Sequence, residues 1–140
     1  MRRQTVQEVS NTQKYIMQTR PILQKQALFS DGTKDYRIPM EPKPNETVTI
    51  RFRTAKDNVD AVWLCTDKNS YFMDFFESDG TYDYYSVDIM LGTEPFSYYF
   101  EIVSGLLKCR YDRYGVTREI RKQYFFRIAP GFSTPDWAKG

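Results

Sequence analysis

Apolar and polar residues alternate with a period of two along much of the chain, and residues 47–54 show the pattern most clearly. Val48, Ile50 and Phe52 fall on one face of this segment, while threonine and arginine residues occupy the other. The same alternation recurs farther along the chain, at residues 84–90 and 96–102. Because successive side chains of a strand point to opposite faces, each segment is predicted to be a strand with one buried face.

Shorter apolar runs between turn-forming residues predict further strands at residues 27–29, 36–38, 59–65, 106–111 and 124–128. Residues 66–81 are expected to form a long loop. About eight short strands without helical crossovers indicate an all-β, immunoglobulin-like antiparallel β-sandwich. Its core is predicted to contain Val48, Ile50, Phe52, Trp63, Val87, Tyr98 and Phe100. Trp63 is included because Val59, Ala61, Trp63 and Cys65 share one face, which is expected to point inward.

The two ends of the chain have a different character, so three parts are predicted. Residues 1–26 are polar and rich in glutamine, and they are expected to form either a short, weakly amphipathic helix or a disordered extension. Residues 27–130 form the predicted sandwich. Residues 131–140 follow Pro130 and are interpreted as a linker.

Charge and hydropathy exclude several classes of partner. The 20 Lys and Arg residues nearly balance the 18 Asp and Glu residues, which argues against nucleic acid and anionic membranes as partners. Basic residues at Arg110, Arg113, Arg118, Arg121 and Lys122 are interpreted as a solvated edge. Since neither a membrane-spanning apolar run nor the apolar stretch of a signal peptide is present, the chain is expected to be cytoplasmic.

The residue types needed for several kinds of catalysis are missing. The chain has no histidine, which excludes histidine triads and zinc hydrolase sites of the usual type. The two cysteines, Cys65 and Cys109, lack metal-ligand spacing, and their isolation favours two reduced thiols over a disulfide. Asp79 and Asp83 could be cast as a glycosidase pair, but their position in a predicted turn argues against that role. The loop aspartates are expected to shape turns. No catalytic residue, metal or cofactor is predicted.

Several segments, in order along the chain, resemble landmarks of a known family. They are Ala27–Asp31 (ALFSD), Val48–Asp57 (VTIRFRTAKD), Val62–Lys68 (VWLCTDK), Tyr82–Tyr85 (YDYY), Tyr98–Phe100 (YYF) and the ending FSTPDWAKG. Together they are similar to family 34 carbohydrate-binding modules, which precede the catalytic barrel of neopullulanases, cyclomaltodextrinases and maltogenic amylases. Two positions depart from that family pattern: Ser30 stands where histidine is common, and Asn69 stands where dimeric members often carry an aromatic residue.

The resemblance implies a non-catalytic N-terminal domain of an α-glucan hydrolase, and the end of this chain then looks like the junction with the barrel. Maltooligosaccharide or starch, the catalytic barrel and a second copy of the enzyme are the implied partners. An immunoglobulin-like interaction domain without sugar affinity is the alternative. Because glucan binding needs aromatic platforms and hydroxyl partners, the candidate site is placed in the loop from Asp67 to Tyr82, with Tyr84 just after it. Its predicted residues are Lys68, Asn69, Tyr71, Phe72, Phe76, Tyr82 and Tyr84. For each ring of the loop, folding back to close the sandwich is an equal alternative.

Overall fold

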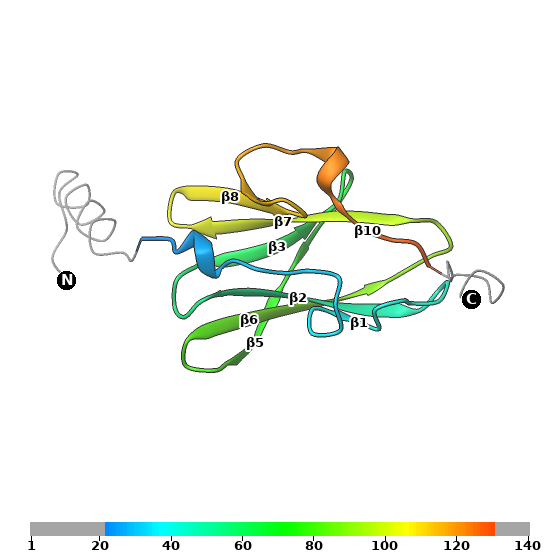
Figure 1. Cartoon of the computed structure of the whole chain (residues 1–140), viewed down its shortest axis with the longest axis horizontal. Coiled ribbons are helices and arrows are strands. Elements are labelled where there is room, and N and C mark those ends of the chain that lie inside the picture. The colour runs from blue at the N-terminus through cyan, green and yellow to red at the C-terminus, as the bar shows by residue number, and fades with distance from the viewer. Residues whose placement is uncertain (1–21, 131–140) are drawn as a thin grey trace, which may run out of the picture.

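The computed structural model describes residues 22–130, which form two antiparallel sheets packed face to face (Figure 1). The four-stranded sheet has the order β1 (Arg37–Ile38), β2 (Thr47–Ala55), β6 (Tyr82–Met90), β5 (Asp74–Ser78). The six-stranded sheet has the order β4 (Ser70–Phe72), β3 (Ala61–Cys65), β7 (Phe96–Ser104), β8 (Leu107–Asp112), β9 (Gly115–Thr117), and β10 (Phe126–Ile128) also pairs with β7. The predicted all-β sandwich is therefore confirmed.

The N-terminal extension and the linker fall mostly outside this region. Of the predicted extension, only residues 22–26 are described, and they lead into a short 3₁₀ turn, η1 (Lys25–Ala27). The predicted linker, residues 131–140, lies outside the described residues. In place of the strand expected at 27–29, Phe29 makes an isolated bridge to Arg53. Within residues 22–130, no helix is long and apolar enough to cross a membrane.

The core lies between the two sheets and follows the predicted alternation. Val48, Ile50 and Phe52 of β2 have no exposed surface, and the same holds for Tyr98 and Phe100 of β7. The rings of Phe52 and Phe100 pack against each other between the two sheets, with their centroids 4.6 Å apart. Val87 of β6 points toward the same core and is partly buried against it. These predicted core positions hold because period-two alternation marks strands with only one buried face.

The prediction that Trp63 lies in the core is wrong, because its side chain faces away from the core. In β3 the fully buried residues are Val62 and Leu64, whereas Trp63 is half-buried on the outer face of the six-stranded sheet. All five residues of β3 are apolar, so alternation alone could not orient the strand. The cross-strand partners give the orientation: Leu64 lies opposite the core residue Phe100, and Trp63 lies opposite Glu101. Outside the core, Trp63 packs against a second cluster formed by Cys65, Tyr99 and Phe125.

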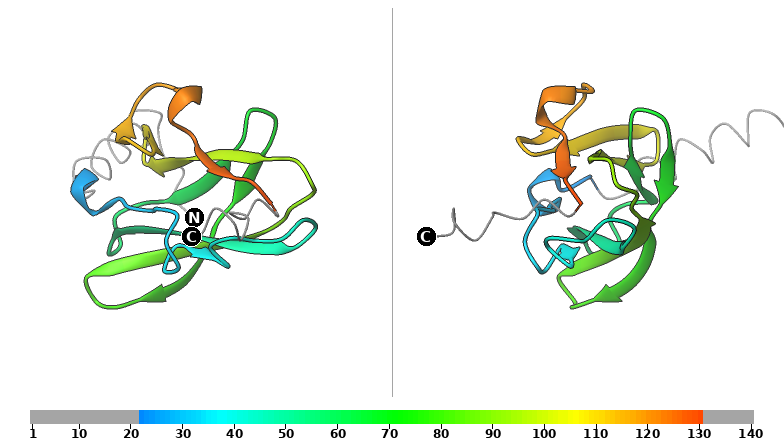
Figure 2. Two further views of the ribbon diagram at one scale, coloured as in Figure 1. Left: turned by 45° about the vertical axis from the view of Figure 1, so that its right-hand side comes forward. Right: turned by 90° about the vertical axis from the view of Figure 1, so that its right-hand side faces the viewer.

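The predicted long loop at 66–81 is also wrong. A tight turn at residues 66–69 leads into β4 on the edge of the six-stranded sheet, and the chain then crosses to β5 on the edge of the four-stranded sheet. Figure 2 shows this green segment passing from one layer to the other. Met73 sits at the crossing with no exposed surface, and its N–H donates to the carbonyl of Val62 at 2.9 Å. Every residue of β5 is exposed, so the strand lacks the alternation that would have revealed it.

The predicted solvated edge holds its charges in specific pairs. Asp112 of β8 is buried, with 2% of its surface exposed, and it accepts hydrogen bonds from Nε and Nη2 of Arg121 at 2.8 and 2.7 Å. Arg110 lies 3.5 Å from Glu101. This segment also contains the unpredicted strand β9 and a 3₁₀ turn, η2 (Lys122–Tyr124). The predicted solvated edge holds, since Arg113, Arg118 and Lys122 are exposed, and the ion pairs of Arg110 and Arg121 in addition anchor the connection from β8 to β10.

The two thiols are free and lie on opposite faces of one sheet. Cys109 belongs to the core, whereas Cys65 belongs to the outer cluster beside Tyr99. A disulfide needs side chains that converge, and these diverge across the sheet. The prediction of two reduced thiols is therefore confirmed.

Candidate functional site

The structure distributes the predicted site residues over three places. Lys68, Asn69 and Tyr71 line a cavity at one end of the sandwich. Phe72 lies on the outer face of the six-stranded sheet, where its ring meets that of Trp63 edge to face at 5.2 Å. The remaining three residues lie on the four-stranded sheet; they are Phe76, Tyr82 and Tyr84.

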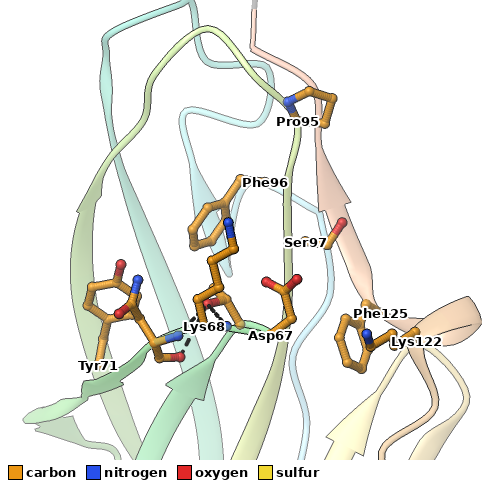
Figure 3. Close-up of a pocket in the computed structure, with 10 residues that line it drawn as sticks. Asp67, Lys68, Tyr71, Pro95, Phe96, Ser97, Lys122 and Phe125 are labelled. Atoms are coloured by element: carbon orange, nitrogen blue, oxygen red, sulfur yellow. Dashed lines mark hydrogen bonds between the residues drawn. The ribbon is translucent and has the colours of Figure 1, made fainter.

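The cavity, here named the turn cavity, forms where the β3–β4 turn approaches the start of β7 and the η2 segment (Figure 3). Its volume is about 440 Å³, within the range of small-ligand sites. The aromatic residues that line it are Tyr71, Phe96 and Phe125. The other lining residues are Thr66, Asp67, Lys68, Asn69, Ser97, Lys122 and Pro95. The cavity therefore combines ring surfaces with hydrogen-bonding groups.

The β3–β4 turn is held by its own hydrogen bonds. The Thr66 N–H donates to the Asn69 carbonyl at 2.8 Å, and the Thr66 hydroxyl oxygen accepts the N–H groups of Lys68 and Asn69 at 3.2 and 2.9 Å. The backbone of the turn is thereby satisfied without the side chains of Lys68 and Asn69. Neither side chain hydrogen-bonds to another part of the described structure, so both are available to a ligand.

The rings of the cavity are fixed by packing. Tyr71 and Phe96 are partly buried against the core, so each presents only part of its ring to the cavity. Phe125 is held by Tyr99, with ring centroids 4.7 Å apart. Phe96 and Phe125 were missed as site residues because they read as ordinary core positions of strands. Lys122 was missed because only the pairing of β10 with β7 brings η2 beside the turn.

On the outer face of the four-stranded sheet, arginines already cover aromatic rings. The guanidinium carbon of Arg51 lies 4.8 Å from the Phe76 ring centroid, and that of Arg53 lies 4.2 Å from the Tyr82 ring centroid. Cation–π contacts of this kind stabilise the rings in place. They also occupy a ring face that a sugar would use, so Phe76 and Tyr82 offer less free platform than the sequence suggested.

Tyr84 is engaged with a turn carboxylate. Its hydroxyl donates to Oδ2 of Asp79 at 3.0 Å, and partial burial together with this hydrogen bond raises the pKa of Tyr84 to about 12. Asp79 also accepts the N–H of Tyr82 at 2.7 Å, and such backbone hydrogen bonds lower the pKa of Asp79. A lowered pKa is the opposite of what a general acid requires. Asp79 is therefore a turn former, as predicted.

Neither Asp83 nor a cluster of metal ligands adds chemistry to this region. Asp83 is buried and accepts the N–H of Asp57 at 2.9 Å, a contact that fixes the β2–β3 connection. Within residues 22–130, no group of three or more His, Cys, Asp or Glu side chains is placed to hold a metal ion.

Comparison with known proteins places this domain in a family. The family model described as "Alpha amylase, N-terminal ig-like domain" matches residues 23–130. The chain belongs to this family. The resemblance drawn from the sequence motifs is thereby confirmed at the level of an α-amylase N-terminal Ig-like domain. No curated protein matched the chain by sequence.

Solved structures share the fold of this Ig-like domain. A cyclomaltodextrinase matches with a TM-score of 0.63 at 21% identity, over 81% of this chain and 22% of its own. The maltogenic amylase from S. marinus matches with a TM-score of 0.61 at 14% identity, over 85% of this chain and 17% of its own. The type III pullulan hydrolase from Thermococcus kodakarensis matches with a TM-score of 0.50 at 18% identity, over 72% and 16%. This chain therefore spans about a fifth of the length of the first two enzymes.

Proposed function

We propose that this α-amylase N-terminal Ig-like domain is a non-catalytic module that binds short maltooligosaccharides in the turn cavity. The observation that carries the proposal is the combination of fixed rings and unbonded polar side chains in one cavity of about 440 Å³. Sugars present apolar C–H faces edged by hydroxyl groups, so they need both kinds of partner at once. The hydrolysis itself then belongs to a catalytic barrel of the same enzyme, which acts on α-glucan.

Five of the lining residues have a defined part in this proposal. Tyr71 and Phe96 support the apolar face of a glucose unit, because packing holds their rings in place. Lys68 and Asn69 donate hydrogen bonds to hydroxyl groups, since their side chains have no partner within the described structure. Asp67 is the acceptor at the centre of the cavity as seen in Figure 3. Short soluble sugars as ligands are in keeping with the cytoplasmic location expected from the sequence.

The test is calorimetric titration of the domain with maltoheptaose and with β-cyclodextrin. Replacing Asn69 by alanine removes about one hydrogen bond, worth roughly 1 kcal/mol, and should weaken binding about fivefold. Lys68→Ala should act in the same direction. Both positions are exposed, so the melting temperature should stay unchanged. Phe76→Ala, on the four-stranded sheet, is the matched control and should leave affinity unchanged. Loss of affinity in Phe76→Ala with none in Asn69→Ala would move the site to the outer face formed by Phe76, Tyr82 and Tyr84.

A second candidate function is contact with the catalytic barrel or a second copy of the enzyme. The observation that favours it is two exposed rings on the neighbouring segments β4 and β5, where Phe72 and Phe75 have 51% and 56% of their surface exposed. Large exposed apolar groups often mark interfaces. Hydrogen exchange of the domain with and without the barrel should then protect β4 and β5, and unchanged exchange there would exclude this role.

A further inference from the structure

A second cavity lies where the two sheets part between β1 and β10. Figure 2 shows these strands, in cyan and in orange-red, along the same side of the molecule. The cavity has a volume of about 500 Å³ and contains three arginines among its lining residues, Arg37, Arg113 and Arg127. Asp31 is the one carboxylate among them. This surface, here named the arginine groove, therefore carries an excess of positive charge.

Arg37 is the anchor of the groove. It lies on the edge strand β1 opposite Ile50, so its side chain points toward the space between the sheets. Its Nη2 donates to the hydroxyl of the fully buried Tyr98 at 2.8 Å. Gly32 leaves room for this guanidinium, because a Cβ at Gly32 would lie 3.1 Å from Nη1 of Arg37. The position of the charged group is thus built into the fold.

The Arg37 guanidinium lacks an anionic partner. Its Nε is buried without a hydrogen-bond acceptor, and Arg37 makes no ion pair within residues 22–130. Asp31 lies beyond ion-pair distance of Arg37, and its Oδ1 instead accepts the N–H and the hydroxyl of Thr33 at 2.9 and 2.6 Å. A buried donor without an acceptor is costly, so a native structure that keeps one beside a cavity suggests a ligand.

The neighbouring arginines are placed to help with such a ligand. The side chain of Arg127 is exposed and has no hydrogen bond or ion pair within the described structure, so it is free to engage an anion. Arg113 uses Nη2 for the Gln123 carbonyl at 2.9 Å, which holds its guanidinium beside the groove. Guanidinium groups bind carboxylates and phosphates through paired N–H donors. Arg37 points toward the space between the sheets, and the exposed Arg113 and Arg127 add positive charge among the lining residues of the same cavity, which favours a small oxyanion.

The aromatic residues that line the cavity favour a ligand that has an apolar part in addition to its negative charge. Phe29, Tyr111 and Phe126 also face this cavity, which is far larger than an inorganic anion needs. We propose that the arginine groove binds a small organic anion of about the size of a sugar, with its phosphate or carboxylate on Arg37 and its apolar part against these rings. The proposal does not depend on the turn cavity, which lies at a different place on the sandwich and is lined by different residues.

The experiment is an NMR titration of the ¹⁵N-labelled domain that follows the arginine Nε–H signals. The probes are glucose 6-phosphate, glucuronate, inorganic phosphate and neutral glucose. The Arg37 Nε–H signal should shift with glucose 6-phosphate or glucuronate, and the stronger of these two identifies phosphate or carboxylate as the preferred group. Binding of that probe should be at least about tenfold tighter than binding of inorganic phosphate, and glucose should cause no shift. The absence of any Arg37 shift with all anions would overturn the proposal, and equal affinity for inorganic phosphate would overturn the role of the rings.

Variants separate binding from folding. Arg127→Gln, at an exposed position, should weaken binding by about fivefold without a change in melting temperature, in keeping with a lost charge-assisted hydrogen bond of roughly 1 kcal/mol or more. Lys108→Gln is the matched control, because Lys108 is exposed and pairs with Glu101 on the outer face of the six-stranded sheet. It should leave binding unchanged. Equal effects of the two variants would show non-specific charge attraction and overturn the site. Maltoheptaose binding should be the same in Arg127→Gln and wild type, so failure of either proposal is visible separately.

Discussion

The crossing of the chain between the two sheets at Met73 makes a quantitative prediction about stability. Met73 has no exposed surface, and it is held between the edge strands β4 and β5. Replacing a buried methionine by alanine removes its transfer energy and leaves a cavity, at a cost of about 2–5 kcal/mol. Since a whole domain is stable by only about 5–15 kcal/mol, Met73→Ala should remove a large part of the total. The melting temperature should fall by roughly 10–20 °C.

Met90 provides a control of identical chemistry. It ends β6 with 80% of its surface exposed, so Met90→Ala should change the free energy of unfolding by no more than about 0.5 kcal/mol. Urea unfolding followed by tryptophan fluorescence and by circular dichroism gives both values. If Met73→Ala proved as harmless as Met90→Ala, residues 70–78 would form a loose loop, and the two-sheet crossing would be wrong.

Three further predictions concern titration and reactivity. Because burial and the hydrogen bond to Asp79 raise the pKa of Tyr84 to about 12, its ring signals should titrate near that pH, and Asp79→Asn should lower the midpoint. The pKa of Asp79 is lowered below its ordinary value of 3.8, so its contribution to stability is complete above that pH and is lost as the pH falls through the folded pKa. Acid unfolding of Asp79→Asn should accordingly show a weaker pH dependence than wild type in that range. Burial raises the pKa of both the Cys65 and Cys109 thiols, so both should react slowly with a disulfide reagent in the folded domain and rapidly in urea, whereas rapid reaction of folded protein would contradict their burial.

The sequence predicted the long, half-buried strands well, and the reason is physical. The core residues of β2, β6 and β7 recur with a period of two that is visible in the sequence, although Tyr99 of β7 is also buried on the outer face. The strand β3 is apolar throughout, so Trp63 was placed on the wrong face. The edge strand β5 is exposed throughout, so it was taken for a loop. Alternation of apolar and polar residues could not orient β3 or reveal β5, because in each of these strands the two faces do not differ.

The candidate site could be predicted only in part. The turn residues Lys68 and Asn69 and the ring of Tyr71 were found because they are close together in sequence. Phe96 and Phe125 come from distant segments, and only the register of β10 on β7 brings the second of them to the cavity. The arginine groove was not predicted at all. It arises from the spacing of the two sheets at their open side, which no local pattern encodes.

An amide chemical-shift map of the domain titrated with maltoheptaose tests the turn cavity directly. Shifts should be concentrated at residues 66–71, at Phe96 and at Phe125, with the outer face of the four-stranded sheet unaffected. Shifts confined to Phe76, Tyr82 and Tyr84, or no shifts at any sugar concentration, would contradict the turn cavity as the glucan site.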